Sequence, residues 1–316
     1  MNAQLSSPGT GPLDRSPFDI DDGETYAGWR DWKLGCHPAS PAELAVEVAD
    51  PFNLTESEHA ALLDRIRRAN MALYVSDPVD ADTGKDLIRA VGSQFGLNQL
   101  DANMLADDDG VTPLTVMEDG RRPRYIPYTN RPISWHTDGY YNTMDRQDRS
   151  LLLYCVQDAA EGGENAVLDH EIAYILLREE NPDFIRALMH PHAMTIPANV
   201  EENVEIRSAR TGPVFSVDPL DGTLHMRYTA RKRNIEWRDD SVTHDAVAFI
   251  ERLTNGDSPY LFRHRMTPGQ GLVSTNVLHD RSGFNDSPEM GIKRLLYRAR
   301  YFDRIAGTTI GEVWPG

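Results

Sequence analysis

The sequence predicts an α+β protein that is mainly β, with a jelly-roll or sandwich core and helices packed outside it. From residue 114 onwards, short apolar runs of strand length alternate with turn residues, and a few helical segments interrupt them. The chain has no long βαβ alternation and no glycine-rich nucleotide loop, which argues against a parallel α/β sheet. Of the 316 residues, 40% are hydrophobic, enough for a sizeable core.

The N-terminal segment differs in composition from the rest. Residues 1–30 are rich in Pro, Gly and Ser and poor in apolar side chains, so we expect a flexible N-terminal arm. Trp29 and Trp32 are candidates for fixing the end of this arm to the body. No later composition shift marks a boundary, and residues 31–316 are predicted to form a single domain.

The remaining elements follow from apolar periodicity and from turn and capping residues. Strands are expected at residues 71–75, 114–117, 151–156, 166–168, 214–217, 224–228, 260–262, 272–275 and 294–302. Helices are expected at residues 55–68, 82–96, 171–178, 182–189 and 245–253. Asp221-Gly222 between two of these strands is a hairpin signal, and Thr55 with Glu58 forms the pattern of a capping box.

Charge and cysteine content restrict the class of protein. A net charge of −17 disfavours unspecific binding to nucleic acid or to an anionic membrane. No run of 18 apolar residues and no signal-peptide pattern is present. Cys36 and Cys155 are far apart and are expected to stay reduced. We therefore predict a cytoplasmic protein that acts on a small molecule, and we leave a homo-oligomer open.

His136 and Asp138 are the first indication of chemistry. On an extended backbone, residues two apart point to the same face, so this imidazole and carboxylate can converge on one point. They would supply two thirds of the 2-His-1-carboxylate set that binds non-haem Fe(II), and the third ligand must be another His. Such pairs also occur in ordinary exposed turns. The neighbouring aromatics Trp135, Tyr140 and Tyr141 favour the wall of a partly dry pocket.

The second informative stretch lies near the C-terminus. His279 stands at the end of a predicted strand, and Arg294, Arg298 and Arg300 share parity on the last one. Three arginines on one face of an apolar strand are costly to bury without anions, and a dianionic ligand would supply partners. Taken singly, each feature has an ordinary alternative. His279 could be a structural histidine, and the arginines could pair with acidic residues on a solvated edge.

Together these stretches resemble the Fe(II)/2-oxoglutarate-dependent dioxygenases of the TauD/TfdA (taurine dioxygenase) and clavaminate-synthase-like superfamily. The resemblance covers about residues 70–303 and implies a double-stranded β-helix, which is a distorted jelly roll. The matching pieces are His136-Thr137-Asp138-Gly139, Gly162-Gly163-Glu164-Asn165, His279-Asp280-Arg281-Ser282-Gly283-Phe284 and Arg294-x-x-x-Arg298.

The resemblance also implies roles for single residues. His136, Asp138 and His279 would hold Fe(II), and Arg294 would bind the distal carboxylate of 2-oxoglutarate. Arg298 would bind either the other end of that cosubstrate or an anionic group of the substrate. Asn165 stands where relatives often carry Thr, and its amide would help to hold 2-oxoglutarate.

The implied reaction uses O₂ and 2-oxoglutarate, releases succinate and CO₂, and hydroxylates or desaturates an unactivated C–H bond. A small anionic or amino-acid-like substrate is expected. Its candidate contacts are Arg300, Arg227, Tyr140, Tyr141 and Trp135, together with the basic loop Arg121-Arg122-Pro123-Arg124. Two alternatives remain: a non-catalytic jelly-roll binding module, and a cupin-like metal dioxygenase that does not use 2-oxoglutarate.

Overall fold

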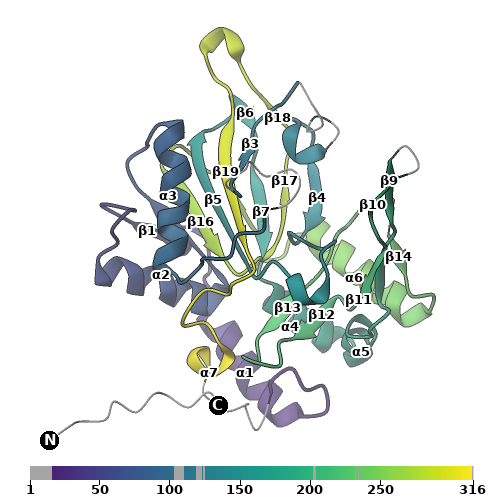
Figure 1. Ribbon diagram of the computed structural model, residues 1–316. Helices are drawn as coiled ribbons and strands as arrows, with labels where there is room; N and C mark the ends of the chain where they lie inside the picture. Colours follow the sequence, from purple (N-terminus) through teal and green to yellow (C-terminus); the bar gives the residue numbers. More distant parts are fainter. Residues whose placement is uncertain are drawn as a thin grey trace, which may run out of the picture.

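Two sheets packed face to face form the centre of the molecule (Figure 1). The computed structural model describes residues 16–102, 110–118, 123, 125–201, 204–231, 233, 235–314 and 316. The basic loop residues Arg121, Arg122 and Arg124, and residues 1–15 of the predicted arm, lie outside the described residues.

The larger sheet has six strands in the order β1-β2-β16-β5-β19-β3. These strands span Ala45–Glu47 (β1), Met71–Val75 (β2), Gln270–Ser274 (β16), Ser150–Gln157 (β5), Leu295–Tyr301 (β19) and Thr112–Leu114 (β3). All neighbours are antiparallel except β1 and β2. Antiparallel neighbours from distant parts of the chain are the arrangement expected of a jelly roll, and not of an α/β fold.

The smaller sheet has four antiparallel strands in the order β15-β7-β17-β4. They span Phe262–His264 (β15), Asn165–Leu168 (β7), Leu278–Arg281 (β17) and Ile133–His136 (β4). Its inner face contributes Phe262 and Val167 to an apolar cluster shared with Leu73, Leu153 and Leu272 of the larger sheet. The space between the sheets is therefore an apolar core.

Shorter strands form four small sheets at the periphery. They are β6 (Glu161–Gly162) with β18 (Phe284–Asn285), β8 (Met194–Ile196) with β11 (Arg210–Gly212) and β14 (Glu236–Trp237), β9 (Asn199–Glu201) with β10 (Val204–Arg207), and β12 (Phe215–Val217) with β13 (Leu224–Met226). The last pair is the predicted hairpin, which the register of Ser216 opposite His225 confirms.

Helices cover the outside of the sheets. They are α1 (Gly23–Cys36), α2 (Glu56–Ala69), α3 (Ala81–Gln94), α4 (His170–Glu180), α5 (Pro182–Leu188), α6 (Ser241–Asn255) and α7 (Ile310–Val313). The part of the chain that the structure describes also has short 3₁₀ segments, namely η1 (Pro41–Leu44), η3 (Ile126–Tyr128), η4 (Met144–Arg146) and η5 (Pro288–Met290). Helices α2 and α3 cover the outer face of the larger sheet (Figure 1). Among the described residues, no helix is long and apolar enough to cross a membrane.

The capping pattern at Thr55 is confirmed in detail. Its side chain accepts a hydrogen bond from the backbone N–H of Glu58, and the Glu58 carboxylate accepts one from the backbone N–H of Thr55. At the other end of α2, Asn70 takes the left-handed conformation with φ 58°. Asn tolerates this conformation better than most residues, so it ends the helix and directs the chain into β2.

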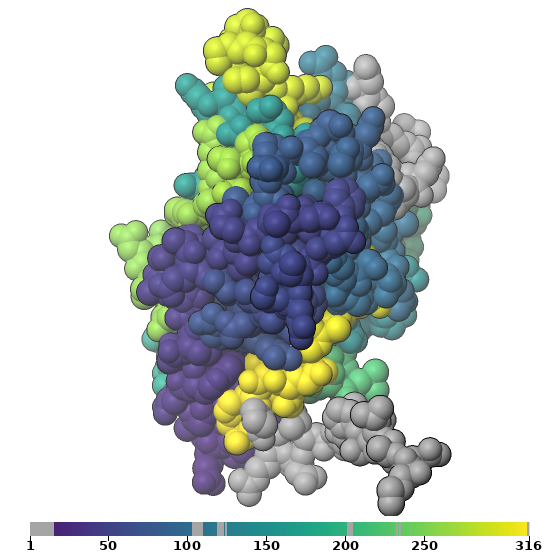
Figure 2. Space-filling view, turned by 90° about the vertical axis from the view of Figure 1, so that its left-hand side faces the viewer, coloured from purple at the N-terminus to yellow at the C-terminus, as the bar shows by residue number. Residues whose placement is uncertain are grey.

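The predicted arm over residues 1–30 is wrong for its second half. Helix α1 begins at Gly23, and Trp29 is fully buried against Phe18 and Tyr174. Lys33 is also fully buried, with Nζ 2.7 Å from Asp169 and 2.5 Å from Glu171 at the start of α4. In Figure 2 this N-terminal segment, in purple, packs directly against the rest of the molecule. Its Pro, Gly and Ser content concealed a short amphipathic helix that packs onto the body.

Candidate metal centre and adjoining pocket

Two histidines face each other across neighbouring strands of the smaller sheet. His136 ends β4, His279 lies on β17, and the two residues are direct partners in the antiparallel register. Their ring centroids are 4.3 Å apart. Asp138 follows in the turn after β4, and one ligand atom from each of the three residues lies within 4.8 Å of the others. All three are at least nine-tenths buried.

Both imidazoles are held in one tautomer by the main chain. His136 Nδ1 lies 2.9 Å from the carbonyl of Ser134, and His279 Nδ1 lies 2.9 Å from the carbonyl of Val277. A carbonyl can only accept, so each Nδ1 carries the hydrogen and each Nε2 keeps its lone pair. Burial and the neighbouring His136 lower the pKa of His279 to about 4, which keeps this imidazole neutral at neutral pH.

Arg298 keeps the carboxyl group of Asp138, the third candidate ligand, ionised. Burial alone would raise the pKa of Asp138, but Arg298 and His136 oppose it and hold the pKa well below its usual range. Arg298 Nη1 lies 3.1 and 3.3 Å from the two Asp138 oxygens. Two imidazoles and one carboxylate, all buried and convergent, are a donor set that fits Fe(II).

Asn276 ties the two halves of this centre together. Its Oδ1 accepts from the backbone N–H of Asp138 at 2.8 Å. Its Nδ2 donates to the carbonyls of Asp138 at 2.9 Å and Asp148 at 2.7 Å. Asn276 takes φ 58° and stands three residues before His279. The strand that carries one histidine is thereby fixed to the turn that carries the carboxylate. The sequence analysis missed this residue, although an Asn at the end of a buried strand is a signal for a left-handed turn.

Arg300 supports the site from behind, and it does not reach the pocket. Its side chain is 2% exposed, forms ion pairs with Asp101 and Asp148, and donates to the Tyr141 hydroxyl at 2.8 Å. The predicted contact of Arg300 with the substrate is therefore corrected to a positioning contact with Tyr141.

Arg294 is a buried cation in an apolar setting. It is 2% exposed, and burial lowers its pKa to about 10. Arg281, whose pKa burial and Arg294 lower to about 9, stacks with it on the ring of Phe284, at 4.9 Å and 5.0 Å from the ring centroid. Among the described residues, no carboxylate lies within ion-pair distance of Arg294, although Asp286 accepts from its backbone N–H. A buried guanidinium of this kind fits the carboxylate of a ligand.

Asn165 lines the same cavity as His279, and only part of its side-chain amide is free to bind a ligand. Its Nδ2 donates to the carbonyl of Asp280 at 2.8 Å, whereas its Oδ1 is buried without a partner. Gly163, two residues earlier, has φ 75°, and a Cβ there would stand 3.3 Å from Arg294 Nε. This turn therefore brings the main chain close to the Arg294 side chain, as the predicted 2-oxoglutarate site requires.

A pocket of about 100 Å³ adjoins the triad and is lined by His136, Asp138 and Arg298. Four tyrosines form part of its walls: Tyr140 and Tyr141, and also Tyr125 and Tyr128, which the sequence analysis did not single out. The other lining residues are Ile126, Pro127, Ile133, Ser134, Thr229 and Arg231. Arg231 lies over the ring of Tyr140, with 5.7 Å from its guanidinium carbon to the ring centroid. The pocket thus combines stacking surfaces with cations.

Two predicted substrate contacts are wrong. Trp135 is 5% exposed and belongs to the apolar cluster around α4, because its side chain points away from that of His136. Arg227 donates to the carbonyls of Tyr140, Met194, Gly212 and Arg210. These main-chain contacts occupy every nitrogen of its guanidinium. Arg227 therefore holds these main-chain segments together and does not bind a ligand.

The sequence profile described as "Taurine catabolism dioxygenase TauD, TfdA family" matches residues 36–300. The chain belongs to the TauD/TfdA dioxygenase family. This confirms the family that the sequence resembled, and the mixed α+β fold with a jelly-roll core is confirmed with it.

Curated members of the family include relatives in two actinobacterial genera. A uridine-5′-phosphate dioxygenase of Amycolatopsis sp. is 33% identical over 174 residues, which are 53% of this chain and 60% of that protein. A uridine-5′-phosphate dioxygenase of Streptomyces sp. is 29% identical over 223 residues, covering 67% and 77%. The matched stretch thus spans less than two thirds of the Amycolatopsis relative.

Solved structures of the family share the fold at low sequence identity. The non-heme iron oxygenase OrfP, in complex with Fe, succinate and (3S)-hydroxy-L-Arg, has a TM-score of 0.56 at 14% identity and covers 78% of this chain and 81% of its own. An asparagine oxygenase in complex with Fe(II), 2S,3S-3-hydroxyasparagine and succinate has a TM-score of 0.52 at 13% identity, with the same coverage.

Proposed function

We propose that this protein is an Fe(II)- and 2-oxoglutarate-dependent dioxygenase whose substrate is a nucleoside 5′-phosphate, with uridine 5′-phosphate as the first candidate. One observation carries the enzyme class: two imidazoles and a carboxylate converge inside the jelly roll, beside a buried guanidinium that has no acidic partner among the described residues. Family membership supports the same class.

In this proposal the residues divide the work as follows. His136, Asp138 and His279 hold Fe(II), which together with 2-oxoglutarate and O₂ supplies the oxidising chemistry and leaves succinate and CO₂. Arg294 binds the distal carboxylate of 2-oxoglutarate, and the amide of Asn165 helps to hold this cosubstrate. Arg298 keeps Asp138 ionised and oriented, as partners outside a metal's own ligands commonly do.

The substrate class is supported by the pocket and by the relatives. Both actinobacterial relatives are named for uridine 5′-phosphate. Tyr140 and Tyr141 offer flat faces on which a base can stack, and the guanidinium of Arg231 can meet a phosphate.

The enzyme class is tested under anaerobic conditions. Protein with Fe(II) should develop a visible metal-to-ligand charge-transfer band when 2-oxoglutarate is added. A non-catalytic jelly roll, and a metal dioxygenase that does not use 2-oxoglutarate, both predict no band. The variant His136→Ala should lose both the band and Fe(II) binding.

The substrate is tested by comparing three compounds under air. Uridine 5′-phosphate should stimulate succinate release, and its own mass should change because it is oxidised. Uridine, which lacks the phosphate, and trimethyllysine, which is a small cationic amino acid, should be oxidised weakly or not at all. Arg231→Gln should raise the KM for uridine 5′-phosphate and leave the KM for 2-oxoglutarate unchanged. Equal stimulation by uridine would reject the phosphate as a recognition element.

The location of the protein and its oligomeric state are also part of this proposal. A cytoplasmic location agrees with two unpaired cysteines, Cys36 and Cys155, both free thiols in the structure. A homo-oligomer stays a prediction, which the molar mass in solution will decide.

A further inference from the structure

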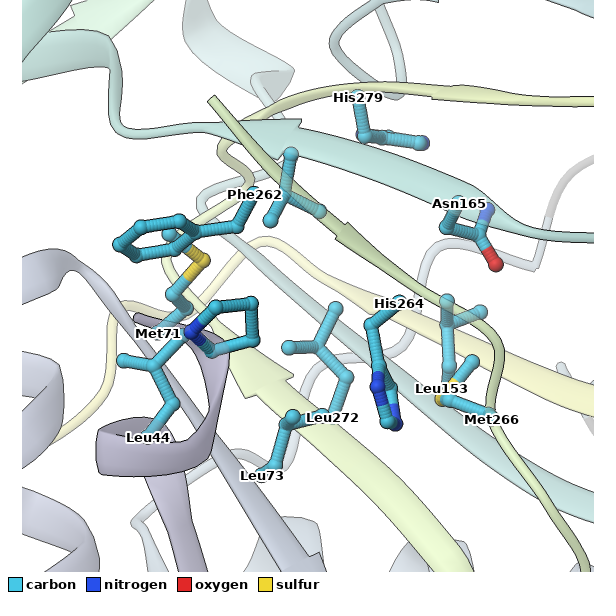
Figure 3. Close-up of a pocket in the computed structure, with 12 residues that line it drawn as sticks. Leu44, Met71, Leu73, Leu153, Asn165, Phe262, His264, Met266, Leu272 and His279 are labelled. Carbon is cyan, nitrogen blue, oxygen red and sulfur yellow. The ribbon is translucent and has the colours of Figure 1, made fainter. Parts of the chain in front are cut away.

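A second cavity lies between the two sheets, next to His279 of the triad (Figure 3). The cavity volume is about 30 Å³, enough for one or two molecules the size of water. Strands β2, β5 and β16 of the larger sheet, β7, β15 and β17 of the smaller sheet, and η1 line it. His279 and Asn165 stand at one end and Leu44 and Phe262 toward the other, so the cavity runs from the metal centre toward the β1 edge of the molecule.

The lining of this cavity is almost entirely apolar. Of its twelve residues, only His279, Asn165 and His264 carry polar side chains, and none is Asp, Glu, Lys or Arg. His264 Nε2 is already paired with Gln270 Oε1 at 2.8 Å. A carboxylate or phosphate placed here would lose its water without gaining a partner, which costs several kcal/mol or more. The cavity therefore does not suit 2-oxoglutarate or a nucleotide.

The register of the larger sheet separates this cavity from the anion site. Leu73, Leu272, Leu153 and Arg298 are successive cross-strand partners and form one row across the inner face. This row leads sideways, from the arginine that contacts Asp138 to Leu73 on β2. Arg294 lies in a different direction, beyond the start of β19. A ligand held between the metal and Arg294 thus runs along a strand, while the cavity runs across the strands.

We propose that this cavity is the entry path by which O₂ reaches the metal centre. The inference rests on the proposed function, in which O₂ is the one small apolar reactant. An apolar gas partitions from water into an apolar cavity, as other small apolar ligands do. The charged reactants enter through the aromatic and cationic pocket, so two separate routes serve the two kinds of reactant.

The first experiment detects dissolved O₂ in the cavity without any metal or turnover. Methyl NMR spectra of the metal-free protein are recorded with and without O₂ pressure, because paramagnetic O₂ broadens nearby methyl signals. Leu73, Leu153 and Leu272, which are 6–8% exposed, should broaden severalfold more than Val48 (5% exposed) and Val247 (8% exposed), which lie in other apolar clusters and do not line the cavity. Equal broadening of the two groups would overturn the proposal.

The second experiment fills the path. Leu272→Phe and Leu73→Trp should raise the KM for O₂ severalfold, with kcat at saturating O₂ and the KM for 2-oxoglutarate unchanged. Val273→Ile, on the outer face of the same strand as Leu272, is the matched control and should leave the KM for O₂ unchanged. A folded cavity-filling variant with the wild-type KM for O₂ would reject the path.

The two proposals fail separately. If the wild-type protein shows no charge-transfer band and no O₂ uptake with 2-oxoglutarate, the proposed function is wrong, and the entry path falls with it. If O₂ uptake is normal but the NMR and KM results contradict the expectations, only the entry path is wrong. Should both substitutions prevent folding, the relaxation measurement on the wild-type protein still decides.

Discussion

Replacing Asn276 should weaken metal binding while leaving a folded protein. The side chain makes three hydrogen bonds to buried main-chain groups of Asp138 and Asp148. Each such bond contributes about 1 kcal/mol net, so removing all three should lower the free energy of unfolding by about 2–4 kcal/mol. Residues outside the ligand set that orient metal ligands typically change metal affinity by about 10–100-fold, and we expect that range here.

Three variants separate the hydrogen bonds from the backbone. Asn276→Gly removes the side chain but accepts φ 58°, whereas Asn276→Ala adds a left-handed strain of about 1–2 kcal/mol. Asn276→Asp keeps the acceptor for the Asp138 N–H and loses both donors. Metal affinity should fall in all three variants, whereas the stability of the Ala variant should be lowest.

The assay is an anaerobic Fe(II) titration, with urea unfolding of the same samples. Asn70 is the matched control, since it also has φ 58°, is 3% exposed and makes buried hydrogen bonds, to Asp169 and Thr275. Asn70→Gly should lower stability and leave the dissociation constant for Fe(II) close to the wild-type value. If folded Asn276→Gly binds Fe(II) as tightly as the wild type, the fixing role assigned to Asn276 is wrong.

Three further perturbations test other parts of the structure. Arg294→Met should raise the KM for 2-oxoglutarate by about 30-fold or more. The ligand-free variant should be at least as stable as the wild type, because the substitution removes a buried charge without a carboxylate partner. A loss of several kcal/mol in urea unfolding would contradict this. Trp29→Ala should cost about 3–5 kcal/mol in urea unfolding if α1 is part of the core, and a cost near zero would restore the flexible arm. His170 is 1% exposed, and burial lowers its pKa below 6.5, so below that pH the unfolded chain takes up a proton that the folded chain does not. The free energy of unfolding should therefore fall with falling pH by up to about 1.4 kcal/mol per pH unit from this group, and His170→Gln should reduce that slope in urea series between neutral and mildly acidic pH.

Local periodicity predicted part of the geometry of the candidate metal centre. Strand alternation placed Arg298 and Arg300 on one face of β19, and it predicted that His136 and Asp138 converge, although Asp138 lies in the turn after β4 and not on the strand. The same rule, applied to Trp135, puts that side chain on the opposite face from His136, where the structure has it. The prediction for Trp135 failed because nearness in sequence was given more weight than parity.

The roles of the buried arginines could not be predicted in this way. Whether a guanidinium is available depends on what surrounds it, and those partners are distant in sequence. Arg300 forms ion pairs with Asp101 and Asp148, and Arg227 donates to carbonyls of the turn at Tyr140 and of strands β8 and β11. By contrast, the helix at Trp29 and Lys33 left a readable signal, since Tyr26, Trp29 and Lys33 follow helical spacing. Bulk composition over a longer window obscured it.

The residue-for-residue pairing of His136 with His279 has a consequence for how the chain finds its native alignment. A slip of one residue between β4 and β17 would turn one imidazole to the far side of the sheet. A metal ion held by both side chains therefore stabilises a single pairing of these two strands and no other. Iron added during refolding would therefore favour chains in which β4 and β17 are correctly paired over chains with a shifted register, before any cosubstrate binds.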